Sequence, residues 1–155
     1  MVFSSTRYRY SITLPGGWIA EPAITTWSGT GAPNIMDTSV DVFGPANEAV
    51  TFGVFGSAAP TTSPLAAWVA YRISENFRIH GDLCAPKPDS VEPITIGGRP
   101  GTLVAYDCGL LINDAYTVVN GYGYRFVFRD PTTTTPTNPA DHAMFTTMLG
   151  SVVFN

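Results

Sequence analysis

Hydrophobic and polar residues alternate with a period of two near the start of the chain, which is typical of a half-buried strand. Apolar side chains stand at positions 8, 10, 12 and 14 with polar ones between them, so we predict a strand over Tyr8–Leu14. Further short strands are predicted over Ile24–Trp27, Ser39–Phe43 and Ala49–Ser57. The stretch 28–33 between them is rich in Gly, Thr and Pro and is expected to be a loop.

The apolar spacing changes to a helical period after residue 63, which predicts an amphipathic helix over Pro64–Ile79. Ser63 is the expected N-cap, and Gly81 is the expected stop. The predicted buried stripe of this helix consists of Leu65, Trp68, Val69, Ile73 and Phe77.

A second helix is predicted near the end of the sequence, capped by Asn138, with Pro139 in its first turn and Asp141 bonding back. Gly150 should end it, and residues 152–154 are expected to form a closing strand. The buried face of this helix is predicted to be Met144, Phe145, Met148 and Leu149.

Two hairpins lie between the helices, because each of two pairs of strand-like runs is separated by a two-residue turn signal. Hairpins make a sheet mainly antiparallel, and two amphipathic helices must cover sheet faces. The sequence therefore predicts an α+β fold, a mainly antiparallel β-sheet flanked by two amphipathic helices, in a single domain over 1–155. The paired strands and their turns are Glu92–Ile96 and Arg99–Cys108 about Gly97-Gly98, and Leu110–Val119 and Tyr122–Arg129 about Asn120-Gly121.

The register of the second hairpin sorts its side chains onto two faces. One face should carry an aromatic ladder, which we expect to lie in the core beneath a helix. The ladder consists of Tyr122, Tyr124, Phe126 and Phe128.

The opposite face carries the leading candidate ligand site. Arg125 is expected across from Tyr116 and Arg129 across from Ile112, with Asp114 diagonal to both arginines. Two interpretations stay open. The group forms a cross-strand ion pair on a partly exposed face, or it forms the polar floor of a pocket whose arginines hold a carboxylate or phosphate. A cavity over Arg125 and Tyr116 would favour a ligand, whereas a covering helix or saturated ion pairs would favour the ion pair.

Trp27 is a further candidate ligand-binding residue. It flanks a loop, and both core packing and the wall of a cleft or partner surface fit its position. Trp68 on the helix stripe and Trp18 are expected to be core residues.

Cys84 and Cys108 allow four interpretations, of which a disulfide closing a loop of about 25 residues is the leading one. Two reduced, buried cysteines come next. A zinc site would add His80, but it lacks the paired Cys-x-x-Cys that makes such assignments strong. A Cys–His nucleophilic pair would need a lowered thiol pKa. We therefore expect no metal at this corner.

The number and sign of the charged residues limit the classes of partner that the protein can bind. Charged residues make up 13% of the chain, about half the usual share, and the net charge is −4. There is a single lysine, Lys87, where a binder of nucleic acid backbones would carry a cluster. No apolar run approaches the ~18 residues that span a bilayer. The expected partner is an unknown protein or a small molecule, with no nucleic acid and no membrane, and an oligomer is compatible with the sequence.

Localisation is expected to be cytoplasmic, because the first residues lack an apolar run after a basic start. A secreted domain without its leader is the alternative.

The residues also resemble a known family. The motifs are Tyr8–Trp18, Ala67-Trp68-Val69, His80-Gly81, Glu92-Pro93-Ile94, Gly97–Gly101, Tyr106-Asp107-Cys108, Gly121–Phe126 and Ser151–Phe154. They are similar to domains with the fold of PsbP, the extrinsic photosystem II subunit, and most of all to uncharacterised bacterial members. The Ran-GTPase-binding nuclear-import factor shares that α/β/α sandwich. These motifs are turn glycines and core aromatics, so the resemblance implies a fold.

Characterised members of this fold class are mostly binding or assembly factors without enzymatic activity. No nucleophile elbow, zinc-protease motif or phosphate loop occurs in the sequence, so we expect neither catalytic residues nor a cofactor. The leading hypothesis is a non-catalytic binding or protein-interaction module. The alternative is a small hydrolase or isomerase, with its site at the Arg125/Asp114/Tyr116 face or at the His80/Cys84/Cys108 corner.

Overall fold

The computed structural model describes residues 1–33, 38–47, 52–130 and 138–155 of the chain. Within these residues two helices alternate with short runs of strands, in the order that the sequence predicts. The elements are β1 (Val2–Ser5), β2 (Tyr10–Thr13), β3 (Trp18–Glu21), β4 (Asp41–Pro45), β5 (Gly53–Pro60), α1 (Leu65–His80), β6 (Ser90–Ile96), β7 (Arg99–Asp107), β8 (Leu111–Val119), β9 (Tyr122–Asp130), α2 (Pro139–Gly150) and β10 (Val153–Phe154).

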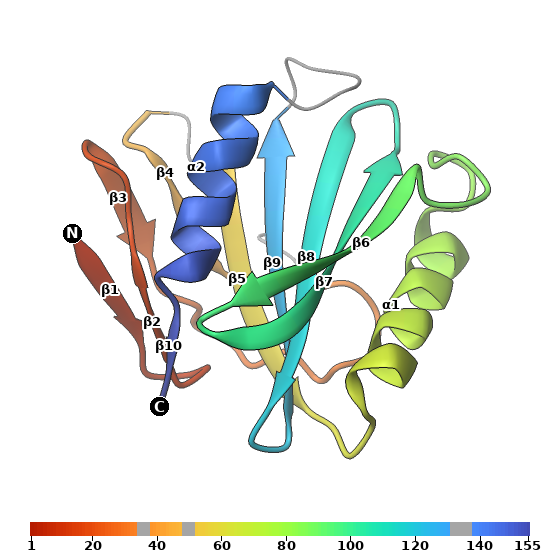
Figure 1. Ribbon diagram of the computed structural model, residues 1–155, viewed down its shortest axis with the longest axis horizontal. Helices are drawn as coiled ribbons and strands as arrows, with labels where there is room; N and C mark the ends of the chain where they lie inside the picture. Colours follow the sequence, from red (N-terminus) through yellow and green to blue (C-terminus); the bar gives the residue numbers. More distant parts are fainter. Residues whose placement is uncertain (34–37, 48–51, 131–137) are drawn as a thin grey trace.

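Seven strands form one antiparallel sheet in the order β3-β4-β5-β9-β8-β7-β6. Three more strands form a small second sheet in the order β1-β2-β10. Helix α1 lies against one face of the large sheet, while α2 and the small sheet lie against the other face (Figure 1). This arrangement confirms the predicted α+β fold with a mainly antiparallel sheet.

Both hairpins form with the predicted turns and register. Asn120 and Gly121 have φ angles of 51° and 79°, and Gly97 and Gly98 have φ angles of 54° and 73°, as a tight turn between twisted strands requires. Ala115 therefore pairs with Phe126, as the sequence predicts. Local turn chemistry thus fixes which side chains of β8 and β9 face α1 and which face α2.

The aromatic ladder of β9 lies in the core, on the side of α2. Tyr124, Phe126 and Phe128 are almost completely buried. Phe145 of α2 contacts Phe128, with ring centroids 5.6 Å apart, and Tyr10 of β2 contacts Phe126 at 5.1 Å. The small sheet and α2 therefore both cover the ladder.

The other face of the large sheet is packed against α1 through its predicted stripe. Trp68 and Val69 are buried, and Leu65, Ile73 and Phe77 pack against the same core. Trp68 lies directly over Gly123 of β9, where a Cβ atom would overlap the indole ring. The glycine in β9 therefore allows the helix to approach the sheet closely.

Several predicted boundaries were wrong. Ile24–Trp27 is not a strand; the strand in this region is β3, and residues 22–33 form a loop against α1. Ser63 is not the N-cap of α1, because Pro64 takes that place without a side-chain cap. The strand predicted over Tyr8–Leu14 begins only at Tyr10, since the chain turns at Arg9 with φ of 56°. Part of the strand predicted over Ala49–Ser57, residues 49–51, lies outside the described residues.

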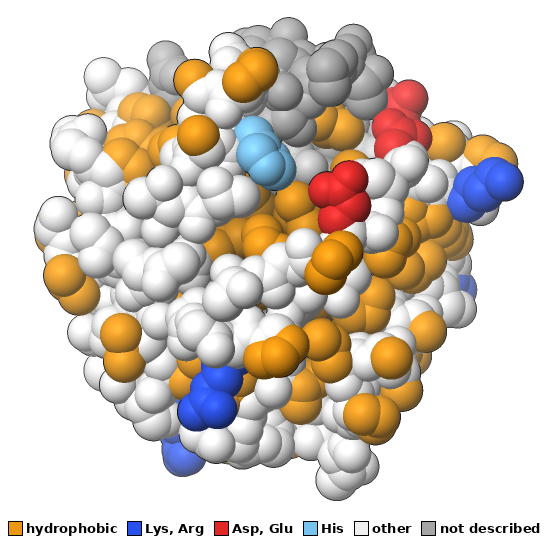
Figure 2. Space-filling view, viewed as in Figure 1, with side chains coloured by type: hydrophobic (Ala, Val, Ile, Leu, Met, Phe, Trp, Pro, Cys, Tyr) orange, Lys and Arg blue, Asp and Glu red, His pale blue; other side chains and the backbone are white. Residues whose placement is uncertain are grey.

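Figure 2 shows few charged side chains on the face of the molecule that carries α2, where hydrophobic and uncharged polar groups are interspersed. Within the described residues, no helix is both long and apolar enough to cross a lipid bilayer.

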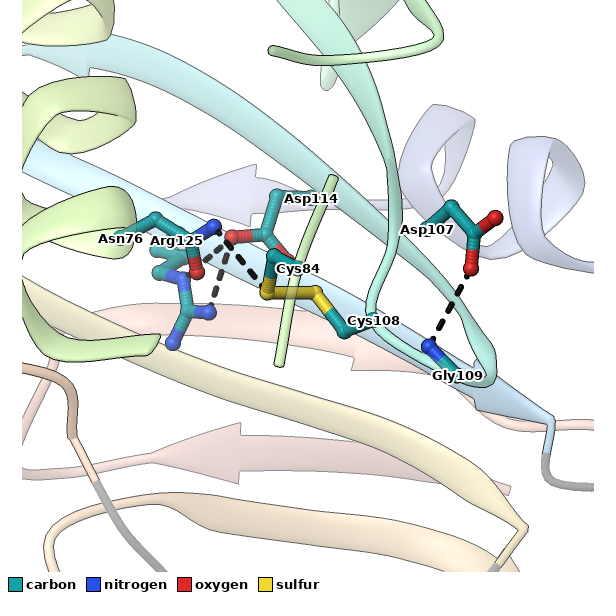
Figure 3. The surroundings of a disulfide bond; sticks show 7 residues. All are labelled: Asn76, Cys84, Asp107, Cys108, Gly109, Asp114 and Arg125. Atoms are coloured by element: carbon teal, nitrogen blue, oxygen red, sulfur yellow. Dashed lines mark hydrogen bonds and ion pairs between the residues drawn. A yellow bond between two sulfur atoms is a disulfide. The ribbon is translucent and has the colours of Figure 1, made fainter. Parts of the chain in front are cut away.

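A disulfide joins Cys84, in the segment after α1, to Cys108, at the turn between β7 and β8 (Figure 3). Backbone N–H groups on this segment also bond to β7: Ala85 donates to Asp107 O at 2.8 Å and Asp89 donates to Ala105 O at 2.9 Å. The bridge and these bonds together fasten the C-terminal end of α1 to the large sheet.

Replacing both cysteines with alanine is expected to lower the free energy of unfolding by about 3 kcal/mol, because the bridge no longer restricts a loop of this length in the unfolded chain. Urea denaturation of the oxidised protein and of the Cys84→Ala/Cys108→Ala variant measures the difference. A loss below about 1 kcal/mol would show that the bridge adds little to the loop's own contacts with β7.

Candidate functional site

Three of the polar residues predicted on the face of the β8–β9 hairpin opposite the ladder, Arg125, Asp114 and Tyr116, interact directly. Arg125 Nε and Nη2 each donate to Oδ2 of Asp114 at 2.8 Å. The hydroxyl of Tyr116 donates to the same oxygen at 2.6 Å. A single carboxylate oxygen thus accepts three hydrogen bonds, and Nη1 of Arg125 is left outside this pairing.

Because this cluster is buried, its charged and polar groups interact strongly with one another. Asp114 is 1% exposed and the Arg125 side chain is 12% exposed. Burial alone would lower the pKa of Arg125, but Asp114 and Tyr116 together raise it above the ordinary arginine value. Burial and the charge of Asp114 both raise the pKa of Tyr116. At neutral pH the Tyr116 phenol is therefore neutral and the Arg125 guanidinium is charged.

Asp114 and Tyr116 are buried and are not among the described residues that line the hollow beside this cluster, whereas Arg125 is. The structure thus has features of both interpretations: Oδ2 of Asp114 is fully engaged in the ion pair, and a hollow opens at the Arg125 end. Asp114 Oδ1 and the Tyr106 hydroxyl, both buried, have no hydrogen-bond partner in the part of the chain that the structure describes.

The hollow lies between the large sheet, the loop before β4 and the C-terminal end of α1, and has a volume of about 250 Å³. This is just under the ~300 Å³ at which ordinary ligand pockets begin. The described residues that line it are Ala32, Pro33, Val40, Phe55, Ser57, His80, Ile112, Arg125, Val127 and Arg129. We call this hollow the arginine cavity.

The floor of the arginine cavity is built by strand register. Ser57 of β5 is paired with Arg125 of β9, and Phe55 is paired with Val127. Arg129 lies two residues further along the same face of β9, opposite Ile112 of β8. The sheet thus presents two arginines on either side of an apolar strip.

His80, the last residue of α1, forms part of the wall. Its backbone carbonyl accepts hydrogen bonds from Leu83 at 2.8 Å and Cys84 at 3.0 Å, so the segment that carries the disulfide also holds His80. Burial lowers the pKa of His80, and the charge of Arg125 lowers it further against an opposing effect of Asp114. The imidazole is therefore mainly neutral at pH 7.

Trp27, a candidate ligand-binding residue in the sequence, packs in the core and is not among the described residues that line the arginine cavity. It is 4% exposed, its ring contacts Trp68 with centroids 6.0 Å apart, and its Nε1 donates to Thr30 O. The Arg72 guanidinium stacks over it at 4.7 Å. Trp27 is part of the packing between α1 and the loop of residues 22–33.

Arg72 and Glu75 of α1 explain why this loop lies where it does. Arg72 donates to the carbonyls of Gly29 and Gly31, and Glu75 accepts from the N–H of Gly31 at 3.0 Å. The hydrogen bond from Arg78, with that from Gly31, lowers the pKa of Glu75 to about 2. These contacts place the loop that supplies Ala32 and Pro33 to the arginine cavity.

Both sulfurs of the His80/Cys84/Cys108 corner are engaged in the disulfide. Neither cysteine can act as a thiolate nucleophile or zinc ligand in this form, because both roles require a free thiolate. Among the residues that the structure describes, no three His, Cys, Asp or Glu side chains gather as around a metal ion.

Sequence reasoning did not assign Ser57 or His80 to the arginine cavity. A signal for Ser57 existed, since it is a lone hydroxyl in a run of small and apolar residues that is otherwise typical of a buried strand. Its position beside Arg125 depends on the pairing of β5 with β9, which joins segments far apart in the chain. The same holds for His80, whose place depends on how α1 crosses the sheet.

Comparison with protein-family models and with curated proteins finds no match for this chain. Solved structures do match. The cyanobacterial PsbP (CyanoP) from Synechocystis sp. PCC 6803 is similar over 100% of this chain and 92% of its own, with a TM-score of 0.65 and 14% sequence identity. A crystal structure from Bacteroides thetaiotaomicron VPI-5482 gives a TM-score of 0.56 and 14% identity.

The second match covers 99% of this chain but only 48% of the other, so this chain spans about half the length of that protein. At 14% identity, both matches show the fold alone. The chain has a PsbP-like fold, as the resemblance in its sequence motifs implied.

Proposed function

We propose that this protein is a non-catalytic binding module that takes a small molecule into the arginine cavity. The observation that carries the proposal is the convergence of Ser57, His80, Arg125 and Arg129 on a hollow that is otherwise apolar. A few polar groups placed in an apolar concavity are typical of sites that orient a small ligand. A PsbP-like fold is compatible with such a role, although a fold by itself does not decide a function.

The arrangement is less suited to the alternative, a small hydrolase or isomerase. Asp114 Oδ2 already accepts three hydrogen bonds, so that oxygen is poorly placed to take a proton from a substrate. A nucleophile would need a base within hydrogen-bond reach. Among the described residues that line the cavity, Ser57 makes no hydrogen bond to His80. The polar groups present can bind and orient, and we assign them that role.

The disulfide bears on the compartment in which the module works. Structural disulfides persist in oxidising environments and are rare in the cytosol of most cells. We therefore favour the secreted alternative over the cytoplasmic one. Detection of free thiols at Cys84 and Cys108 in protein isolated from its native source would overturn this choice.

Blocking the hollow tests the proposal. Ala32 is partly exposed at the rim, so Ala32→Phe should fill the arginine cavity while leaving the core intact. Fragments that are neutral, anionic or cationic are screened by thermal shift. A fragment at about ten times its Kd should raise the Tm of the unmodified protein by about 3–6 °C. The Ala32→Phe variant should lose this response while keeping a cooperative melting transition.

The matched control is Ala66→Phe, which adds the same ring at an exposed position of α1 away from the cavity lining. This variant should keep the full fragment response. The proposal fails if no fragment shifts the melting temperature of the unmodified protein, or if Ala32→Phe responds as strongly as Ala66→Phe.

A further inference from the structure

We infer that the ligand of the arginine cavity is a small monocarboxylate with a compact apolar body. The inference rests on the proposed function and names its ligand class. Three features of the cavity lead to it: its charge, its apolar strip and its size.

Among the described residues, the lining of the cavity carries one positive group that has no acidic partner. The guanidinium of Arg125 is matched by Asp114, which lies 2.8 Å from it. No carboxylate pairs with Arg129 among the residues that the structure describes. His80 is held mainly neutral, because burial and Arg125 lower its pKa. In a chain with a net charge of −4, the described lining of the hollow thus has a local excess of one positive charge.

That excess favours a monoanion over more highly charged ligands. One carboxylate would neutralise Arg129 through a charge-assisted hydrogen bond. A phosphate dianion or a dicarboxylate would bring a second negative charge into a largely apolar hollow, where an unmatched charge is costly.

The apolar part of the lining defines the rest of the ligand. Val40, Phe55 and Val127 belong to a small hydrophobic cluster on this face of the sheet, and Ile112 packs against it. Val127 lies between Arg125 and Arg129 along β9. A ligand with its carboxylate at Arg129 would therefore lay its apolar body along this strip.

The volume limits the size of that body. The hollow measures about 250 Å³. A water molecule takes about 30 Å³ in the liquid, so the hollow has room for a single small ring or a short branched chain. Long-chain fatty acids and nucleotides exceed this room.

Three probes of similar size, each a single ring with a different head group, separate the ligand class from binding as such: benzoate, its neutral amide benzamide, and the cation benzylamine. Isothermal titration calorimetry of the full chain at pH 7 should give an affinity for benzoate at least about tenfold higher than for benzamide, as for a charge-assisted pair. Benzylamine should bind more weakly than benzamide. Inorganic phosphate, the competing anion, should displace benzoate only weakly.

Equal affinities for benzoate and benzamide would overturn the carboxylate class while leaving a small-molecule site in place. Phosphate that binds more tightly than benzoate would overturn it as well. Binding of none of the probes, together with no response in the thermal-shift screen, would defeat both the ligand class and the proposed function.

Two variants test whether the preference for benzoate arises in the arginine cavity. Arg129→Met keeps most of the side-chain volume but removes the unmatched charge, and it should weaken benzoate about tenfold or more while leaving benzamide unchanged. Arg99→Met removes one arginine from the exposed β6–β7 turn and is the control. An unchanged affinity for benzoate in Arg129→Met would overturn the inference.

Discussion

Asp114→Ala is expected to destabilise the protein by about 3–5 kcal/mol, because it leaves the buried guanidinium of Arg125 without its counterion. Asp114 is 1% exposed, and Tyr116 would also lose its acceptor at 2.6 Å. Arg125 can reach water through the arginine cavity, which places the expected loss near the lower end of that range. Equilibrium unfolding in urea, followed by tryptophan fluorescence, measures it.

A double-mutant cycle separates the ion pair from simple truncation. Arg125→Met added to Asp114→Ala removes the stranded charge, so the double variant should recover a large part of the stability that Asp114→Ala loses. If the two substitutions instead add their losses, Asp114 does not stabilise the fold through Arg125, and the electrostatic description of the site is wrong.

Trp68→Ala is expected to cost about 3–5 kcal/mol, as for a large buried aromatic side chain whose removal leaves a cavity. The ring lies over Gly123 and contacts Trp27, so it joins α1, the large sheet and the loop of residues 22–33. Its loss should also loosen the loop that supplies one wall of the arginine cavity. Chemical denaturation measures the stability.

Trp68→Phe is the matched control for this prediction. The indole N–H of Trp68 is buried and has no hydrogen-bond partner within the described residues, so phenylalanine sacrifices no bond there. The loss in free energy of unfolding for Trp68→Phe should be less than half of the loss for Trp68→Ala. A loss below about 1 kcal/mol for Trp68→Ala would show that the apolar stripe of α1 does not hold the helix to the sheet.

Features that depend on local chemistry could be predicted from the sequence. The turn at Asn120-Gly121 needs two adjacent residues with positive φ, and it alone sets the register that brings Arg125 beside Tyr116. The helical stripe around Trp68 and the N-cap of α2 at Asn138 follow from spacing and composition in the same way.

Features that depend on contacts between distant segments could not be predicted. Residues 24–27 read as a short strand in sequence, but side chains from before β2 bond to the backbone here: Arg7 donates to Ala23 O, and the Tyr8 hydroxyl accepts from the Trp27 N–H. The same limit applies to the site, since Ser57 and His80 reach the arginines only through the pairing of β5 with β9 and the path of α1. Half of the polar lining was therefore visible in the β8–β9 hairpin, and half was not.

A crystal structure of the protein grown with benzoate tests the central claim, that the arginine cavity is a binding site. We expect density for benzoate in the hollow, with its carboxylate within hydrogen-bond distance of Arg129 and its ring along Val127 and Phe55. A hollow filled by the protein's own side chains, or benzoate bound only elsewhere, would contradict the claim.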